Sequence, residues 1–336
     1  MNPDAVAETG RVPHGGSTDE RVIDFSANTN PERPPDVVGA YESAFETARR
    51  YPDDDYGEFR RAAAEYLHCA PGRVVPTAGG LEAIRLAVET TVEAGDSVLV
   101  PAPSFGEYAR EVRLQGAEPA FVDHDAVLDA DPAGHALAIV CNPNNPTGGA
   151  YDPDALRAFA DRCRGAGTVL LADEAFLGFT GHPSMAGEDG VVVARSLTKL
   201  FGLPGLRAGF AVATGERLTR LRNARRSWTL GAPAAAVGAH CLRQAAFVAD
   251  TRERVESERE RLREALSRDF AVRPSDAPFL LVDVGDRDVD ALVAALRDRG
   301  IAVRDATTFR GLDSHVRVAV RTPAENDLLA EAMRDV

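Results

Sequence analysis

Hydrophobic residues in the middle of the chain form short continuous runs instead of alternating with polar residues. Five such runs, rich in Val, Leu and Ala, cover residues 97–103, 135–143, 168–175, 190–197 and 207–214. Continuous runs of this length indicate strands that are buried on both faces, as in a largely parallel sheet. Candidate helices lie among them at about 80–94, 106–115, 152–165 and 215–226. This order of elements predicts an α/β fold.

The C-terminal third has a different pattern. A long helical stretch at about 233–268 becomes densely charged, which indicates a solvated helix with ion pairs between residues four apart. Short apolar runs at 279–285, 301–306 and 315–323 then alternate with helical patterns at 289–300 and at the C-terminus. We therefore expect an irregular N-terminal segment (1–35), a large domain with a mostly parallel sheet (36–232), and an interdomain helix followed by a small α+β domain (233–336).

The composition narrows the class of protein. With 336 residues, 44% of them hydrophobic, the chain can bury a large core. No apolar run approaches the roughly 20 residues that span a bilayer, and the N-terminus lacks the features of a signal peptide. The four scattered cysteines form neither a disulfide framework nor a zinc motif. These features predict a cytoplasmic protein with no bound metal and no membrane association.

The charged residues add a specific clue. A net charge of −14 argues against nucleic acid as a partner. Of the 38 lysine and arginine residues, 37 are arginine, and Lys199 is the single lysine. A cytoplasm of very high salt and codon bias in a GC-rich genome could each explain this composition, and both explanations stay open. Under either explanation, Lys199 occupies a position whose chemical role an arginine could not fulfil.

Three polar stretches follow predicted strands. Residues 141–149 (CNPNNPTGG), Asp173 and Lys199 each come at or just after the end of an apolar run. Because ligands bind at the carboxyl ends of parallel strands, we expect an amide, a carboxylate and an amine around one site. A primary amine forms a Schiff base with an aldehyde, whereas a guanidinium does not. Beside a carboxylate, this chemistry is typical of pyridoxal phosphate (PLP), whose ring acts as an electron sink.

The sequence resembles the fold-type I PLP enzymes, the aspartate aminotransferase superfamily, over essentially the whole chain. The motifs that carry the resemblance are NPNNPTG (142–148), DEAF (173–176) and SLTKLFGLPGLRAGF (196–210). The resemblance implies PLP as the cofactor. It also implies the PLP-dependent transferase-like fold, with a mostly parallel central sheet in the large domain and a smaller α+β domain.

Site residues follow from the same resemblance. Lys199 matches the lysine that binds PLP covalently, and Asp173 matches the partner of the pyridinium nitrogen. Asn145 matches the asparagine at the phenolic oxygen, and Phe105 matches the aromatic residue on the ring face. The implied phosphate contacts are the side chains of Ser196, Thr198 and Arg207 and the backbone amides of Gly80 and Leu81.

Two positions depart from the usual pattern of the superfamily, and a third implies a partner. Leu81 stands where a serine or threonine is usual, and Phe176 stands where many relatives have a tyrosine. One hydroxyl contact to the phosphate and one to the phenolic oxygen are therefore absent. Tyr51 resembles a tyrosine that reaches the cofactor phosphate of the neighbouring subunit, which implies a homodimer with shared active sites.

Two branches of the superfamily are most similar, the threonine-phosphate decarboxylases and the histidinol-phosphate aminotransferases. The stretches HGG (14–16), DFSANTNP (24–31) and VRVAVRTPAEN (316–326), together with Phe176, resemble the decarboxylases. This likeness implies PLP-dependent decarboxylation of O-phospho-L-threonine to (R)-1-amino-2-propanol phosphate in cobalamin biosynthesis. A histidinol-phosphate aminotransferase or another class I or II aminotransferase is the alternative.

Substrate contacts are expected from two arginines and from the N-terminal segment. Arg317 matches the arginine that binds the α-carboxylate in the superfamily. Arg321 lies four residues later, so on a strand the two share a face about 13 Å apart, and we expect Arg321 to be the second substrate arginine. A solvated charge at the strand end is the alternative for Arg321. His14, which could equally be a surface turn residue, and Asn28 are expected to approach a small phosphorylated amino acid.

Two other classes of protein fit less well. A non-catalytic, PLP-sensing regulator would carry a fused DNA-binding domain, and the predicted elements leave no residues for one. A dinucleotide-dependent oxidoreductase would need G-x-G-x-x-G between a strand and a helix. The stretch GLPGLRAG (202–209) lies on the wrong side of a strand and has the wrong spacing.

Overall fold

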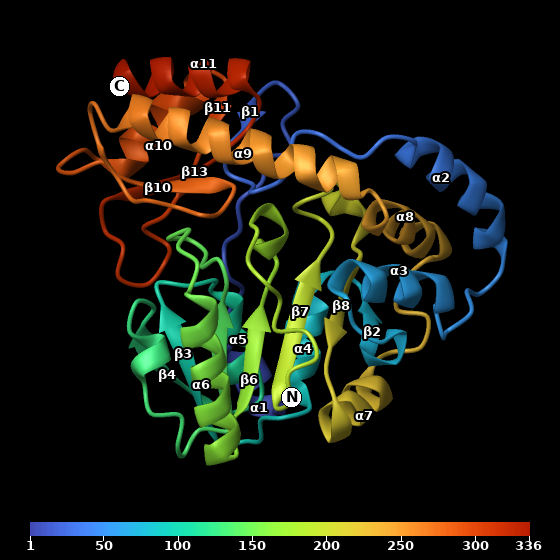
Figure 1. Ribbon diagram of the computed structural model, residues 1–336. Coiled ribbons are helices and arrows are strands. Elements are labelled where there is room, and N and C mark those ends of the chain that lie inside the picture. The colour runs from blue at the N-terminus through green and yellow to red at the C-terminus, as the bar shows by residue number, and fades with distance from the viewer.

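The computed structural model describes residues 1–336 and contains a large central sheet covered by helices (Figure 1). The seven strands run in the order β2-β8-β7-β6-β5-β3-β4. Only β8 is antiparallel to its neighbours, so the expected α/β fold with a mostly parallel sheet is confirmed. Their bounds are β2 (Val74–Thr77), β3 (Ser97–Ala102), β4 (Glu118–Asp123), β5 (Leu137–Cys141), β6 (Val169–Asp173), β7 (Val191–Ser196) and β8 (Gly209–Val212).

Helices on both faces explain why the strands are continuously apolar. The four candidate helices of this region form α4 (Gly80–Glu89), α5 (Glu107–Leu114), α6 (Pro153–Ala166) and α7 (Gly215–Ala224). On β5, Ala138 and Val140 belong to the core on one face of the sheet, while Leu137 and Ile139 belong to the core on the other. Since successive side chains point to opposite faces, a strand covered on both sides needs apolar residues throughout.

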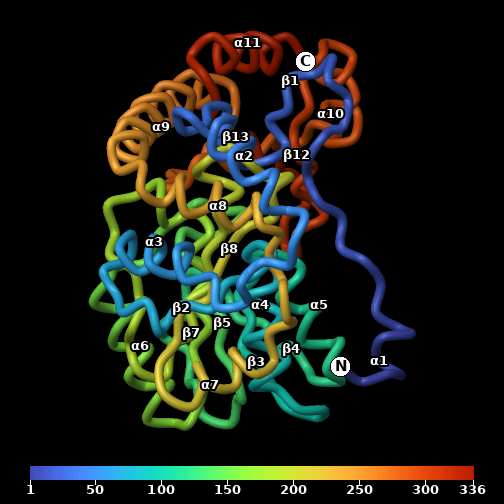
Figure 2. Tube along the Cα trace, turned by 90° about the vertical axis from the view of Figure 1, so that its right-hand side faces the viewer, coloured from blue at the N-terminus to red at the C-terminus, as the bar shows by residue number.

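The N-terminal segment is mostly irregular, as expected, but it contains a short helix, α1 (Pro3–Glu8), and a short strand, β1 (Ile23–Asp24). Figure 2 shows it running along one side of the molecule, from α1 towards β1. Strand β1 pairs in parallel with β11 (Ile301–Ala302), so the segment joins the C-terminal part of the chain. Helices α2 (Val37–Phe45) and α3 (Gly57–Leu67) follow it. Five short 3-10 helices lie at Glu46–Arg49, Pro71–Arg73, Val127–Asp129, Leu177–Phe179 and Pro204–Leu206.

The prediction of a single long helix at 233–268 is wrong in one respect, because the structure has two helices in this region. Helix α8 (Ala232–Leu242) packs on α2 and α3, whereas α9 (Ala245–Leu266) runs above the large sheet towards the small one (Figure 1). The chain changes direction at residues 243–244 to reach both surfaces. Ion pairs on α9 join residues three apart, as in Glu258–Arg261 and Glu260–Arg263, rather than four.

The C-terminal part contains a second sheet. Strands β9 (Ala271–Val272), β10 (Phe279–Asp283), β12 (Arg304–Asp305) and β13 (His315–Ala319) form an antiparallel sheet in the order β12-β13-β10-β9. Helices α10 (Val289–Asp298) and α11 (Pro323–Arg334) accompany it. None of the helices has both the length and the hydropathy that a membrane span requires. The division into parts 1–35, 36–232 and 233–336 stays a prediction.

Candidate active site

A cavity of about 350 Å³ lies where the carboxyl ends of β5, β6 and β7 face the small sheet. Parallel strands end at the same edge of a sheet, so Cys141, Asp173 and Ser196 come together there although they are far apart in the chain. Lys199 follows β7 by three residues and also borders the cavity. All of the predicted site residues border this cavity except Tyr51 and Arg321.

Asp173 closes β6 and is only 5% exposed. One carboxylate oxygen, Oδ1, accepts a hydrogen bond from the backbone N–H of Ala175 at 2.9 Å. The other, Oδ2, accepts one from the hydroxyl of Tyr108 at 2.6 Å. Burial raises the pKa of Asp173 above its ordinary value, and these two hydrogen bonds oppose the rise. The site thus holds a buried carboxylate that a cationic group in the cavity would stabilise.

Lys199 is placed to act as a nucleophile. Burial, followed by the nearby charges of Arg317 and Arg207, lowers the pKa of Lys199 to about 8. A neutral amine is the form that attacks a carbonyl, so this environment makes the reactive form available near pH 8. The backbone carbonyl of Lys199 accepts a hydrogen bond from Asn30 at 2.9 Å, which ties the turn after β7 to the N-terminal segment.

An anion cradle forms where α4 begins. Gly79 has a φ of 94°, and a Cβ there would lie 2.5 Å from Nη2 of Arg207, so only glycine lets the guanidinium come this close. A Cβ on Gly80 would lie 3.1 Å from the Cβ of Ser196. The hydroxyls of Ser196 and Thr198 are 2.7 Å apart beside it. A helix N-terminus with two hydroxyls and a guanidinium around it is suited to a phosphate.

Aromatic and amide groups border the space between this cradle and the small sheet. Phe105 contacts Tyr108 edge to face, with ring centroids 5.5 Å apart. Asn145 lies in the cavity and accepts a hydrogen bond from Arg317. Phe176 borders the same cavity and packs its ring edge to face on Phe279. It offers no hydroxyl to a ligand, as the sequence indicated.

This set of groups fits PLP. A buried carboxylate can hold a pyridinium nitrogen, and a lysine with a lowered pKa can bind an aldehyde. The cradle at the start of α4 suits the phosphate, with Leu81 contributing a backbone amide but no hydroxyl. Phe105 can cover a ring face, and Asn145 can donate to a phenolic oxygen. The roles of the individual residues remain proposals.

Arg317, on β13, contributes a buried positive charge from the side of the small sheet. It is 5% exposed, and its Nη2 donates to the backbone oxygen of Ser26 at 2.8 Å. Its Nη1 donates to the side-chain oxygen of Asn145, and its Nε has no partner. No carboxylate neutralises this guanidinium, and burial lowers its pKa. An anionic ligand would supply the missing counter-charge.

The prediction for Arg321 needs correction, because the structure does not bring this residue to the cavity. Strand β13 ends at Ala319, and Arg321 lies in the turn before α11. Its guanidinium pairs with Glu325 at 2.9 Å and donates to the backbone oxygen of Asp24 at 3.1 Å. Besides Arg207 and Arg317, Arg304 borders the cavity, and it lies on β12 directly opposite Arg317. Arg304 donates to the backbone oxygen of Pro13 and to the hydroxyl of Thr308.

The N-terminal segment covers part of the cavity with His14 and Asn28. His14 lies 2.9 Å from a carboxylate oxygen of Glu107, and its ring centroid is 5.7 Å from that of Phe105. Asn28 is buried, and its side-chain oxygen has no hydrogen-bond partner. Both side chains therefore border the space where a substrate would enter.

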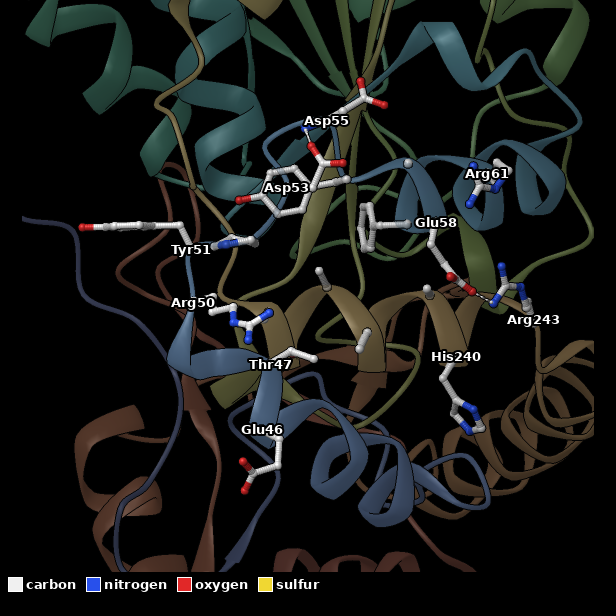
Figure 3. Close-up of a pocket in the computed structure, with 18 of the residues that line it drawn as sticks. Glu46, Thr47, Arg50, Tyr51, Asp53, Asp55, Glu58, Arg61, His240 and Arg243 are labelled. Carbon is white, nitrogen blue, oxygen red and sulfur yellow. Dashed lines mark hydrogen bonds and ion pairs between the residues drawn. The ribbon is translucent and has the colours of Figure 1, made fainter.

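Tyr51 lies away from this cavity. It is 80% exposed and contacts Trp228 in a tilted arrangement, with ring centroids 4.6 Å apart. It borders an open groove formed by residues 46–61 and the face of α8, where Glu58 and Arg243 form an ion pair (Figure 3). Its contact with a neighbouring subunit stays a prediction.

Sequence reasoning missed two polar residues of the site, Arg304 and Tyr108. Tyr108 lies three residues after Phe105, and this helical spacing is the one signal that could have placed it in the site. Arg304 gave no signal, because its position depends on the register between β12 and β13. Both matter below.

Comparisons with known proteins agree with the geometry. A family model for class I and II aminotransferases matches residues 20–333. Threonine-phosphate decarboxylase of Salmonella typhimurium is 32% identical over 96% of this chain and 93% of its own length. Histidinol-phosphate aminotransferase 1 of Archaeoglobus fulgidus is 30% identical over 94% of this chain and 99% of its own length.

A solved structure gives the same result for the fold. Histidinol-phosphate aminotransferase from Sinorhizobium meliloti, in complex with pyridoxal 5′-phosphate, superimposes with a TM-score of 0.83 at 23% identity. The match covers 100% of this chain and 95% of that chain. The resemblance inferred from the motifs is therefore confirmed: the chain belongs to the class I and II aminotransferase family and is a PLP-dependent enzyme.

Proposed function

We propose that this enzyme decarboxylates O-phospho-L-threonine to (R)-1-amino-2-propanol phosphate, a step of cobalamin biosynthesis. The observation that carries the proposal is the pair of arginines, Arg304 and Arg317, which face the cavity that Lys199 enters. They lie opposite each other on neighbouring strands, and neither forms an ion pair with a carboxylate.

Two unpaired guanidinium groups favour a substrate with two anionic groups. Arg317 is buried and Arg304 is half-buried, so an anionic ligand that pairs with both guanidinium groups gains charge-assisted hydrogen bonds from each. O-phospho-L-threonine carries a carboxylate on its α carbon and a phosphate on the neighbouring side-chain oxygen. A small molecule of this kind can reach both arginines while its amine points towards Lys199. His14 lies at the same cavity and can add a further contact to the phosphate.

Bound PLP supplies an electron sink for the electron pair that is released when a bond to the substrate α carbon breaks. The residues of this chain then decide which bond breaks. Arg304 and Arg317 fix the two anionic groups and so set the rotation about the bond between the amine and the α carbon. Asp173 stabilises positive charge at the inner end of the cavity. Lys199 holds a proton that it can deliver to the α carbon after CO2 has left.

The alternative is transamination by a histidinol-phosphate aminotransferase, for which the same lysine would remove the α proton. Relatives of both kinds match the chain at 30–32% identity. The sequence features that favour decarboxylation lie at the cavity, namely His14 in the HGG stretch, Asn28 in DFSANTNP, and Phe176. They support the choice of branch through the resemblance.

A comparison of substrates tests the proposal. Purified enzyme with PLP receives either O-phospho-L-threonine alone or histidinol phosphate with 2-oxoglutarate. We expect CO2 and aminopropanol phosphate in equal amounts from the first mixture and no glutamate from the second. Formation of glutamate without CO2 would show that the enzyme is an aminotransferase.

We also propose a homodimer with shared active sites. Large apolar side chains are exposed at Val38, Tyr41 and Phe45 of α2 and at Tyr51 and Trp228, whose rings contact each other. Helix α2 leads directly into the groove that Tyr51 borders, and exposed apolar side chains of this kind favour contact with a second copy. Tyr51 is free to reach across such an interface.

A further inference from the structure

The hydroxyl of Tyr108 is the one side-chain group that donates a hydrogen bond to Asp173. Tyr108 lies in the first turn of α5 and is completely buried, with no part of it reaching solvent. The distance from its hydroxyl oxygen to Oδ2 of Asp173 is 2.6 Å, which is typical of a strong hydrogen bond to a charged oxygen.

The two oxygens of Asp173 have different donors. Oδ1 accepts a hydrogen bond from the backbone N–H of Ala175, which any residue other than proline would also supply at that position. Oδ2 depends on the Tyr108 hydroxyl alone. Without the Tyr108 hydroxyl, the charged carboxylate would lose one of its two hydrogen bonds.

Tyr108 also contacts the aromatic residue of the site. Its ring meets Phe105 edge to face at 84°, with centroids 5.5 Å apart. One buried side chain therefore touches both the carboxylate at the inner end of the cavity and the ring proposed to cover a cofactor face. This double contact fixes the position of Asp173 relative to Phe105.

We infer that Tyr108 is a positioning residue, which keeps Asp173 charged and aimed at the ring nitrogen of bound PLP. The inference rests on the role proposed for Asp173. A proton between Asp173 and the ring nitrogen can reside on either partner. A donor to the carboxylate stabilises its charged form and so keeps the proton on the nitrogen.

The Tyr108→Phe variant removes the hydroxyl and keeps the ring contact with Phe105. Holoenzyme is prepared with PLP that carries ¹⁵N in the ring, and the chemical shift of that nitrogen reports its protonation. In the wild type we expect a protonated nitrogen. In Tyr108→Phe we expect the ratio of protonated to unprotonated nitrogen to fall about 10-fold or more, as for loss of a hydrogen bond to a charged group. An unchanged nitrogen shift in Tyr108→Phe would overturn the inference.

Tyr151→Phe is the matched control. Tyr151 is a half-buried tyrosine of the large domain, and its hydroxyl donates to the backbone oxygen of His124 at 2.9 Å and lies outside the cavity. Its loss should change thermal stability and leave the nitrogen shift unaltered. Equal shifts in the two variants would mean that the effect reflects general loosening of the domain, which would also contradict the inference.

Asp173→Asn separates this inference from the role of Asp173 itself. We expect an unprotonated nitrogen in Asp173→Asn and no further change when Tyr108→Phe is added to it. If Asp173→Asn leaves the nitrogen protonated, the proposed role of Asp173 is wrong. If Asp173→Asn removes the proton but Tyr108→Phe does not shift the equilibrium, only the inference about Tyr108 fails.

Discussion

At the scale of single residues, the environment of Lys199 explains why one lysine persists among 37 arginines. Burial and the guanidinium groups of Arg317 and Arg207 all disfavour the charged form of its amine. An arginine in this position would stay protonated and could not bind an aldehyde. The surrounding arginines contribute charge and hydrogen bonds, for which a guanidinium is well suited. The amine of Lys199 is thus the one basic group whose reaction with an aldehyde an arginine could not provide.

The lowered pKa of Lys199 predicts how PLP capture depends on pH. Because the pKa is about 8 and not near 10.5, the neutral amine is about half populated at pH 8 and nearly complete about one unit higher. We therefore expect the rate at which the apoprotein captures PLP to rise with pH up to about 8 and then to level off. Stopped-flow absorbance measures this rate. A rate that keeps rising towards pH 10 would indicate an unperturbed lysine, and Lys199→Ala serves as the blank.

At the scale of elements, strand pairing decides which arginines meet at the cavity. The apolar pattern at 315–323 predicts a single strand, and on that strand Arg317 and Arg321 share a face. The strand ends at Ala319 because Thr322 and Glu325 form a capping box and Pro323 begins α11. Arg321 is drawn to Glu325, and β12 brings Arg304 opposite Arg317.

Substitution of Arg304 and of Arg321 can be compared directly for the effect on substrate binding and on stability. Arg304→Gln should raise the KM for O-phospho-L-threonine about 10-fold or more, since it removes a charged contact to an anionic group. Arg321→Gln should leave KM unchanged and lower the thermal unfolding midpoint, because its partner is Glu325 on α11. Steady-state kinetics and thermal unfolding of both variants check this. A larger effect on KM from Arg321→Gln would reverse the assignment.

Local patterns were sufficient for some elements and not for others. The five predicted strands and four predicted helices of the large sheet region are marked by apolar runs and by caps such as Asp152, whose side chain accepts hydrogen bonds at the start of α6, whereas β2 and β4 were not predicted. The break between α8 and α9 depends on two different packing surfaces, which no local pattern encodes. Arg304 was missed for the same reason, since strand register is a property of two distant segments. Lys199 and Asp173 could be placed at the cavity from the sequence because they lie at or just after strand ends and belong to the superfamily motifs.

At the scale of the whole molecule, three distant parts of the chain build one site. The N-terminal segment contributes His14 and Asn28, the large sheet contributes Asp173 and Lys199, and the small sheet contributes the two arginines. Parallel pairing of β1 with β11 ties the N-terminal segment to the small sheet, so these two parts border the cavity together. If the homodimer is correct, a fourth contribution comes from Tyr51 of a second copy.

Mixed dimers test that contribution. Chains carrying Lys199→Ala and chains carrying Tyr51→Ala should each form dimers with impaired sites. After the two are mixed and allowed to exchange, random pairing should restore about a quarter of the wild-type sites, because half of the dimers then contain one intact site. Light scattering should give twice the 35.8 kDa chain mass for each sample. A monomer, or an exchange that restores no sites, would contradict the shared site.

All of these assignments depend on the covalent link between PLP and Lys199. Apart from the N-terminal amine, this chain has one primary amine, so the site of attachment can be determined without ambiguity. The holoenzyme is reduced with borohydride, digested and analysed by mass spectrometry, with Lys199→Ala treated in parallel. We expect one reduced PLP adduct per chain, on the peptide that contains Lys199, and no adduct in the variant. An adduct at the N-terminus, or an adduct that persists in Lys199→Ala, would contradict the account.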